Sequence, residues 1–205
     1  MAARIVDVEA RTVTVLEAAS EVFAQRGYTA ATIEEIAQLA GIGKGTTYEY
    51  FRSKQDLFLA VVEHDWQRMV ESIDARVEST EGLAIERLEA LTAAVMRSYQ
   101  ELQRLHPAAM EFMVSSGATD ACAQVMACVR GGLAVLRARA AEIIASGIRR
   151  GELRADLVPA DLGTALVGSL DGLLLQAKSD PTMDPARVWR TFLGVIGRGM
   201  AADRE

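Results

Sequence analysis

The feature that most constrains the fold is a stretch in which two helix-forming segments are separated by a glycine turn. In TIEEIAQLAGIGKGTTYEYF, Thr32 is followed three residues later by Glu35, the pairing of a helix capping box. An apolar stripe follows and ends at Gly41, because glycine readily adopts the positive φ of a tight turn. The segment from Gly45 to Phe51 predicts a second short helix. A capped helix, a turn and another helix are typical of a helix-turn-helix.

The rest of the chain favours an all-α fold. Half of its 205 residues are apolar, enough for a sizeable core, whereas aromatic residues make up only 5% and prolines number four. Thr80 is expected to cap the start of the fifth helix, and Pro107 is expected to separate that helix from the next one. Periodicity and capping residues predict nine helices, over residues 12–26, 32–41, 45–51, 57–77, 80–105, 108–114, 120–148, 162–178 and 186–200.

The predicted helices divide into two domains. The short ones, in residues 8–60, form a small helical domain whose helix-turn-helix proper is 32–51. The long ones, in residues 61–205, are able to form a bundle.

The segment GIGKGTTYEYF combines glycines with a lysine, a composition that often holds phosphate. A nucleotide-binding loop requires G-x-x-x-x-G-K-[ST] between a strand and a helix. Here Lys44 is followed by Gly45 and preceded by a predicted helix, so the nucleotide interpretation fails. A DNA backbone fits better. Thr32 and Lys54 each lie at a predicted helix start, where free backbone amides favour an anion.

The second short helix has an inner and an outer side. Thr47 and Phe51 are four residues apart and share a face, which we expect to point inward. Gly45 permits close approach of the backbone. Hydroxyl groups that can bond phosphates or base edges are carried by Thr46, Tyr48 and Tyr50.

The stretch TIEEIAQLAGIGKGTTYEYFRSKQDLF resembles the DNA-binding signature of the tetracycline-repressor (TetR) family, and the resemblance is dense over residues 12–60. It implies an N-terminal three-helix helix-turn-helix domain followed by a six-helix ligand-binding and dimerisation domain. It implies phosphate contacts for Thr32, Tyr50 and Lys54. It implies that the residues facing the major groove are Lys44, Gly45, Thr46 and Tyr48.

Two positions depart from the family pattern. Thr47 stands where the family usually has an aliphatic residue, so we interpret it as a core residue rather than a base reader. Glu49 stands where histidine is common. Its carboxylate could accept a hydrogen bond from cytosine N4 or repel a nearby phosphate, and the sequence leaves both open.

The charge balance limits how this chain can bind DNA. The net charge is −6, and residues 1–56 carry six Lys and Arg against eight Asp and Glu, a net of −2. Binding must therefore depend on a few focused cations supplemented by hydroxyls and helix amides. We expect a shallow salt dependence for each monomer.

The sequence offers no catalytic constellation. His64 and His106 are the only histidines, and the serines lack the context of a nucleophile elbow, so we expect no enzyme, metal site or cofactor. Cys122 and Cys128 fall on different faces of one predicted helix and are interpreted as plain buried thiols.

A methionine-rich group in the second domain is either ordinary core or the lining of an adaptable apolar pocket. The resemblance places the effector pocket among these helices, so we hypothesise a site for an apolar or amphipathic ligand. Its candidate residues are Met96, Tyr99, Met110, Phe112 and Met113.

The last two predicted helices, 162–178 and 186–200, are too apolar to be solvated on all faces. The resemblance implies that they form a homodimer interface, and two-fold symmetry then predicts a palindromic operator in double-stranded DNA. No stretch is long and apolar enough to span a membrane and the start of the sequence lacks a signal peptide, so we expect a cytoplasmic protein.

These observations favour a homodimeric transcriptional regulator, most simply a repressor released by a small molecule. Two alternatives stay open. One is a helical small-molecule-binding protein whose helix-turn-helix no longer binds DNA, and the other is an activator with the same fold.

Overall fold

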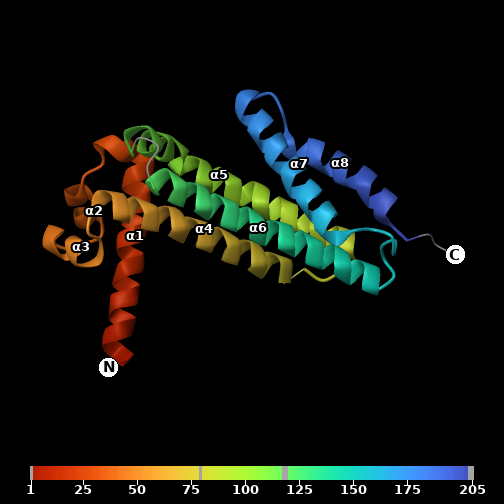
Figure 1. The fold of residues 1–205 in the computed structure, drawn as a ribbon, viewed down its shortest axis with the longest axis horizontal. Helices are drawn as coiled ribbons and strands as arrows, with labels where there is room; N and C mark the ends of the chain where they lie inside the picture. The colour runs from red at the N-terminus through yellow and green to blue at the C-terminus, as the bar shows by residue number, and fades with distance from the viewer. Residues whose placement is uncertain (1, 79, 117–119, 203–205) are drawn as a thin grey trace. The chain divides into compact units, whose positions relative to one another are not determined.

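The computed structural model describes residues 2–78, 80–116 and 120–202, and these residues are almost entirely helical (Figure 1). The helices are α1 (Ala2–Ala30), α2 (Ile33–Leu39), α3 (Lys44–Tyr50), α4 (Lys54–Glu78), α5 (Ala84–Ser116), α6 (Asp120–Arg149), α7 (Pro159–Ser179) and α8 (Pro185–Met200). Over these ranges there is no strand beyond one isolated bridge between Leu153 and Ala201. The all-α fold is confirmed.

Helix α1 joins two helical pieces across a kink at Gly27, whose φ of 78° and ψ of 171° are not helical. Three more helical residues, Tyr28 to Ala30, follow this glycine. The predicted helix 12–26 is extended at its start, since α1 begins at Ala2.

The predicted break at Pro107 is wrong, because α5 runs through this proline without interruption. Proline costs a helix one backbone hydrogen bond and some steric strain. On either side of it Leu105, Ala108 and Phe112 are buried in one core, and tertiary packing of this kind outweighs the local cost. The segments 80–105 and 108–114 consequently form a single element.

Thr80 ends one helix instead of starting the next. Its backbone N–H donates to the carbonyl of Val77 and its hydroxyl to the carbonyl of Arg76, both in α4. The first turn of α5 is held by Glu86, whose carboxylate accepts a 2.7 Å hydrogen bond from the Leu83 N–H. The expected cap at Thr80 is therefore also wrong.

The chain packs into two compact units that do not follow the order of the sequence. One comprises Met1–Arg68 and Gln100–Arg130, and the other comprises Met69–Tyr99 and Gly131–Glu205. Helices α4, α5 and α6 each contribute to both. These units reflect packing and not function, so the domain limits of 8–60 and 61–205 stay a prediction.

The first unit has an aromatic centre. Phe58 lies between Phe23 and Phe112, with ring centroids 5.0 and 4.7 Å away, and all three side chains are fully buried. Tyr28 packs edge-on against Phe112 at 4.9 Å. Aromatic pairs at these distances add to the stabilisation from burial. They fix α1, α4 and α5 to one another within this unit.

The second unit is held by aliphatic packing. Leu88, Ile144 and Leu193 are completely buried within it. Helix α7 approaches α6 closely at Gly163, where an added Cβ would lie 2.7 Å from the carbonyl oxygen of Arg137. None of the described helices is long and apolar enough to cross a bilayer.

Candidate DNA-binding site

The first helix of the helix-turn-helix begins at a complete capping box, as the sequence predicts. The Thr32 hydroxyl accepts a 3.2 Å hydrogen bond from the Glu35 N–H, and the Glu35 carboxylate accepts a 3.1 Å hydrogen bond from the Thr32 N–H. Glu35 also forms an ion pair with Arg26 at 3.4 Å. Thr32 is exposed. A phosphate at this position would have to share the Thr32 hydroxyl and amide with Glu35.

The turn between α2 and α3 follows from Gly41 and Ile42. Gly41 has a φ of 69°, which L side chains rarely adopt. The N–H of Ile42 then donates to the carbonyl of Ala37 at 3.0 Å, and its side chain packs on the core of the first unit. This contact fixes α3 relative to α2.

Helix α3 has one buried residue and a broad exposed side. Thr47 is 1% exposed and Phe51 packs on the core, so both face inward as predicted. Tyr48 is 48% exposed although it is aromatic. The exposed positions of α3 are Lys44, Gly45, Tyr48 and Glu49, and the half-buried ones are Thr46 and Tyr50. Each of the predicted groove-facing residues is thus at least partly accessible to solvent.

Packing within the protein does not require a glycine at position 45. Its backbone is helical, and an added Cβ would meet no atom within 4 Å. Glycine inside a helix costs roughly 1 kcal/mol relative to alanine. The open space above it is what a closely approaching partner would require.

A carboxylate that the sequence analysis did not single out neutralises the first cation of α3. The Lys44 ammonium donates to Glu34 of α2. This hydrogen bond raises the pKa of Lys44 and lowers the pKa of Glu34. Both side chains are exposed, so solvent and salt weaken the pair. Lys44 must exchange Glu34 for DNA in order to act as predicted.

Lys54, at the start of α4, is directed to the last turn of α1. Its ammonium donates a 3.0 Å hydrogen bond to the carbonyl of Thr29 and lies 4.7 Å from the ring centre of Tyr28. Burial lowers the pKa of Lys54, and the nearby Glu111 carboxylate opposes that shift. Because an ammonium has three N–H donors, a phosphate contact is still possible. That role stays a prediction.

The five ligand candidates do not belong to one compact unit. Met96 and Tyr99 lie in the second unit, whereas Met110, Phe112 and Met113 lie in the first. Phe112 is completely buried in the aromatic centre, and Met110 is 45% exposed. Their assignment to a ligand pocket stays a prediction. Among the described residues, no group of three or more potential ligands is arranged to hold a metal ion.

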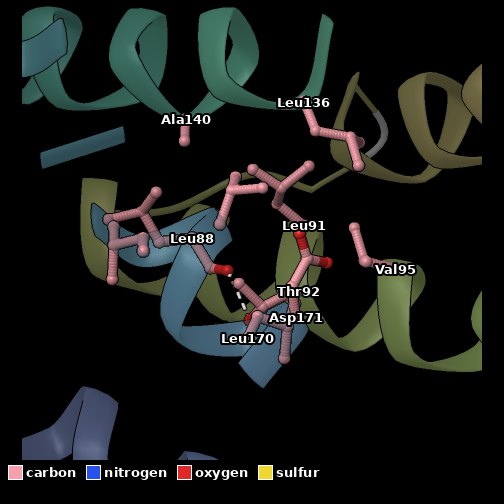
Figure 2. A pocket seen from close by; sticks show the side chains of 10 residues that line it. Leu88, Leu91, Thr92, Val95, Leu136, Ala140, Leu170 and Asp171 are labelled. Atoms are coloured by element: carbon pink, nitrogen blue, oxygen red, sulfur yellow. Dashed lines mark hydrogen bonds between the residues drawn. The ribbon is translucent and has the colours of Figure 1, made fainter. Parts of the chain in front are cut away.

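A small cavity lies elsewhere, among α5, α6 and α7 of the second unit (Figure 2). It encloses about 10 Å³ and is lined by aliphatic residues such as Leu91, Val95 and Leu136. Its two polar residues are Thr92 and Asp171. None of the five candidates lines it. A sign of this site was present in the sequence, since Asp171 is the one charge in the apolar run LVGSLDGLLLQ.

Comparison with known proteins assigns the first part of the chain. The sequence profile of the bacterial regulatory proteins of the tetR family matches residues 15–61. The "HTH-type transcriptional activator FasR" of Mycolicibacterium smegmatis is 43% identical over 65 residues, 32% of this chain and 30% of that protein. Residues 15–61 therefore carry the signature of the tetR family. The "HTH-type transcriptional repressor Rv1474c" of Mycobacterium tuberculosis is 38% identical over 74 residues, 36% of this chain and 37% of that protein.

These matches span about a third of the length of the two relatives. Over the whole fold, the chain is similar to the transcriptional regulator FadR from Bacillus subtilis, whose crystal structure contains stearoyl-CoA. The TM-score is 0.63 at 20% identity, covering 92% of this chain and 98% of that one. The two chains therefore share the same overall fold.

Proposed function

We propose that this chain is a sequence-specific DNA-binding transcriptional regulator, in which α3 enters the major groove. One observation carries the proposal. Thr47 and Phe51 pack inward against the core. The four residues predicted to face the groove lie on the other sides of α3 and remain at least partly accessible. A short helix that exposes a lysine, a glycine and two hydroxyl-bearing side chains suits contact with base edges.

Thr32, Tyr50 and Lys54 are proposed to hold the DNA backbone beside the groove. In the free protein Thr32 bonds Glu35, and the Lys54 ammonium bonds the Thr29 carbonyl. These hydrogen bonds keep the two side chains close to their helix starts. With few cations on this surface, binding requires several weak contacts and shows a shallow salt dependence.

The protein is proposed to act as a homodimer through residues 162–178 and 186–200. Helices α7 and α8 expose large aliphatic side chains, with Leu175 63% and Val195 57% exposed. Such side chains on paired helices are stabilised when a second copy covers them. Two copies would present two α3 helices to a palindromic operator. A monomer in light scattering at micromolar concentration would contradict this arrangement.

Repression relieved by a small molecule is the proposed mode of regulation. The repressor relative supports this mode, and FadR from Bacillus subtilis supports a small-molecule ligand on this fold. A ligand that prefers the state with mis-spaced α3 helices must lower operator affinity by the same factor. The activator FasR favours one second candidate, activation by the same dimer. Transcription in vitro from a promoter that carries the selected operator separates the two.

The deciding experiment is selection of bound sequences from random double-stranded DNA by the full chain. We expect a palindrome with two half-sites about one helical turn apart. Failure to enrich any sequence would favour the alternative of a small-molecule-binding protein whose helix-turn-helix does not bind DNA. Repeating the selection with Glu49→Ala resolves the role left open above. A changed base preference assigns Glu49 to base reading, and tighter binding without such a change assigns it to phosphate repulsion.

A further inference from the structure

The cavity of the second unit contains a carboxylate among aliphatic walls. Leu88, Leu91 and Leu136 are at most 3% exposed, and Asp171 enters the same space from α7. Figure 2 shows the Asp171 side chain directed between Leu91 and Val95. A carboxylate next to an apolar cavity loses hydration, which is costly unless a partner replaces the lost water.

The protein supplies few polar partners that could replace the hydration lost by the Asp171 carboxylate. Within the described residues, Asp171 forms no ion pair and accepts no side-chain hydrogen bond. Burial raises the pKa of Asp171, and Arg137 partly opposes the shift. The Arg137 guanidinium donates a 3.1 Å hydrogen bond to the carbonyl of Leu133 in its own helix. The carboxylate therefore lies near a cation without contacting it.

The second polar group of the cavity is also an acceptor. The Thr92 hydroxyl donates to the carbonyls of Leu88 and Glu89, at 2.8 and 3.1 Å. Its proton is used within α5, so only its lone pairs face outward. A ligand that donates hydrogen bonds and carries positive charge would satisfy both groups at once.

We propose that this cavity is the effector site and that it selects ligands with a protonated amine on an apolar body. The amine would donate to Asp171 and to the Thr92 oxygen, and the body would lie against the leucines of α5 and α6. An anionic ligand would instead place like charges together. This inference rests on the proposed function, because it names the ligand class for the effector of the regulator.

The cavity is so small that a ligand can enter only if the helices around it move apart. A volume of about 10 Å³ holds roughly one water molecule. A larger ligand can enter only where α7 separates from α5 and α6, so it binds the separated state better. Such a difference in affinity between two states is what an effector requires.

The test uses three ligands with the same eight-carbon chain: octylamine, octanol and octanoate. Calorimetric titration of the full-length protein at neutral pH should show octylamine binding at least about tenfold tighter than octanol, as expected for hydrogen bonds to a charged group. Octanoate should bind more weakly than either. Asp171→Asn should remove most of the preference for octylamine over octanol. The control is Asp161→Asn, which removes one exposed charge from the first turn of the same helix and should keep the preference.

Two results would overturn the inference: octanoate binding as tightly as octylamine, or an unchanged preference in Asp171→Asn. If the monomer–dimer equilibrium of Asp171→Asn shifts together with that unchanged preference, the carboxylate belongs to the interface instead. Retention of the selected operator by the wild-type protein without ligand is measured in parallel. If the wild-type protein retains the operator but shows no preference for octylamine, only this inference is rejected, whereas absence of operator binding rejects the proposed function.

Discussion

The backbone N–H of Thr29 donates a 2.9 Å hydrogen bond to Oε2 of Glu111, which joins the last turn of α1 to α5 within the first unit. The same carboxylate lies against Gly27, where an added Cβ would be 2.7 Å from Oε2. The Thr29 carbonyl meanwhile accepts from Lys54. Both backbone groups of Thr29, in the last turn of α1, are therefore hydrogen-bonded to side chains of other helices.

Removal of Glu111 should loosen this turn. For Glu111→Ala we expect a loss of about 1 kcal/mol in the free energy of unfolding, the usual net value of one hydrogen bond. Gly27→Ala should cost more, because it combines a positive φ with the clash. Urea denaturation of both single variants and the double variant provides the measurement. The double variant should lose less than the sum, since removing Glu111 removes the clash. Strict additivity would show that the two sites are independent.

Thr47 is a buried hydroxyl that no hydrogen bond satisfies, because its Oγ1 lacks a partner among the described residues. Thr47→Val should therefore raise the free energy of unfolding by about 1 kcal/mol, as the desolvation cost of the hydroxyl disappears. Thr46→Val at the half-buried neighbouring position is the matched control and should be near neutral. A clear loss of stability in Thr47→Val would mean that a water molecule bonds this hydroxyl.

Glu34 competes with DNA for Lys44. Glu34→Gln should tighten binding to the selected operator and steepen its salt dependence, because Lys44 becomes free to neutralise phosphate. Fluorescence anisotropy at several salt concentrations measures both effects. Lys44→Met should reverse them. Unchanged affinity in Glu34→Gln at low salt would show that Lys44 does not contact DNA.

Gly163 marks the closest approach of α7 to α6, where the opposing atom is a backbone carbonyl that cannot rotate away. Gly163→Ala should lower the free energy of unfolding by roughly 1–3 kcal/mol, the cost of overpacking. Gly168 lies in the same helix with no atom within 4 Å of an added Cβ. Gly168→Ala should accordingly be neutral or stabilising. Thermal unfolding of the pair gives a direct comparison, and equal melting temperatures would disprove the close contact.

Asp171 should make the stability depend on pH. Burial raises the pKa of this carboxyl above its ordinary value of 3.8, so the folded state favours the protonated form. That stabilisation is complete below the ordinary pKa and is lost as the pH rises through the folded value. Asp171→Asn should therefore have a higher Tm than the wild type at pH 7, and the difference should shrink as the pH falls toward 3.8. A difference that does not vary with pH would exclude titration of Asp171 as its cause.

The sequence was most informative where the interactions are local. The capping box of Thr32 and Glu35, the positive φ of Gly41, and the inward face of Thr47 and Phe51 all depend on residues within a few positions of one another. Helical periodicity and capping preferences act over the same range, so these features could be derived from the residues alone.

Features that join distant segments could not be derived in this way. The continuous α5 through Pro107 depends on the burial of Phe112 against α1 and α4, which outweighs the local preference to end a helix. The hydrogen bond from Thr29 to Glu111, the pairing of Lys44 with Glu34 and the position of Asp171 beside Thr92 each bring together residues far apart in the chain or on different helices. By itself the sequence determined an all-α chain with a tetR-like helix-turn-helix. Only the tertiary structure decided which charges on it are satisfied, because a charge acquires its partners from packing and not from neighbours in sequence.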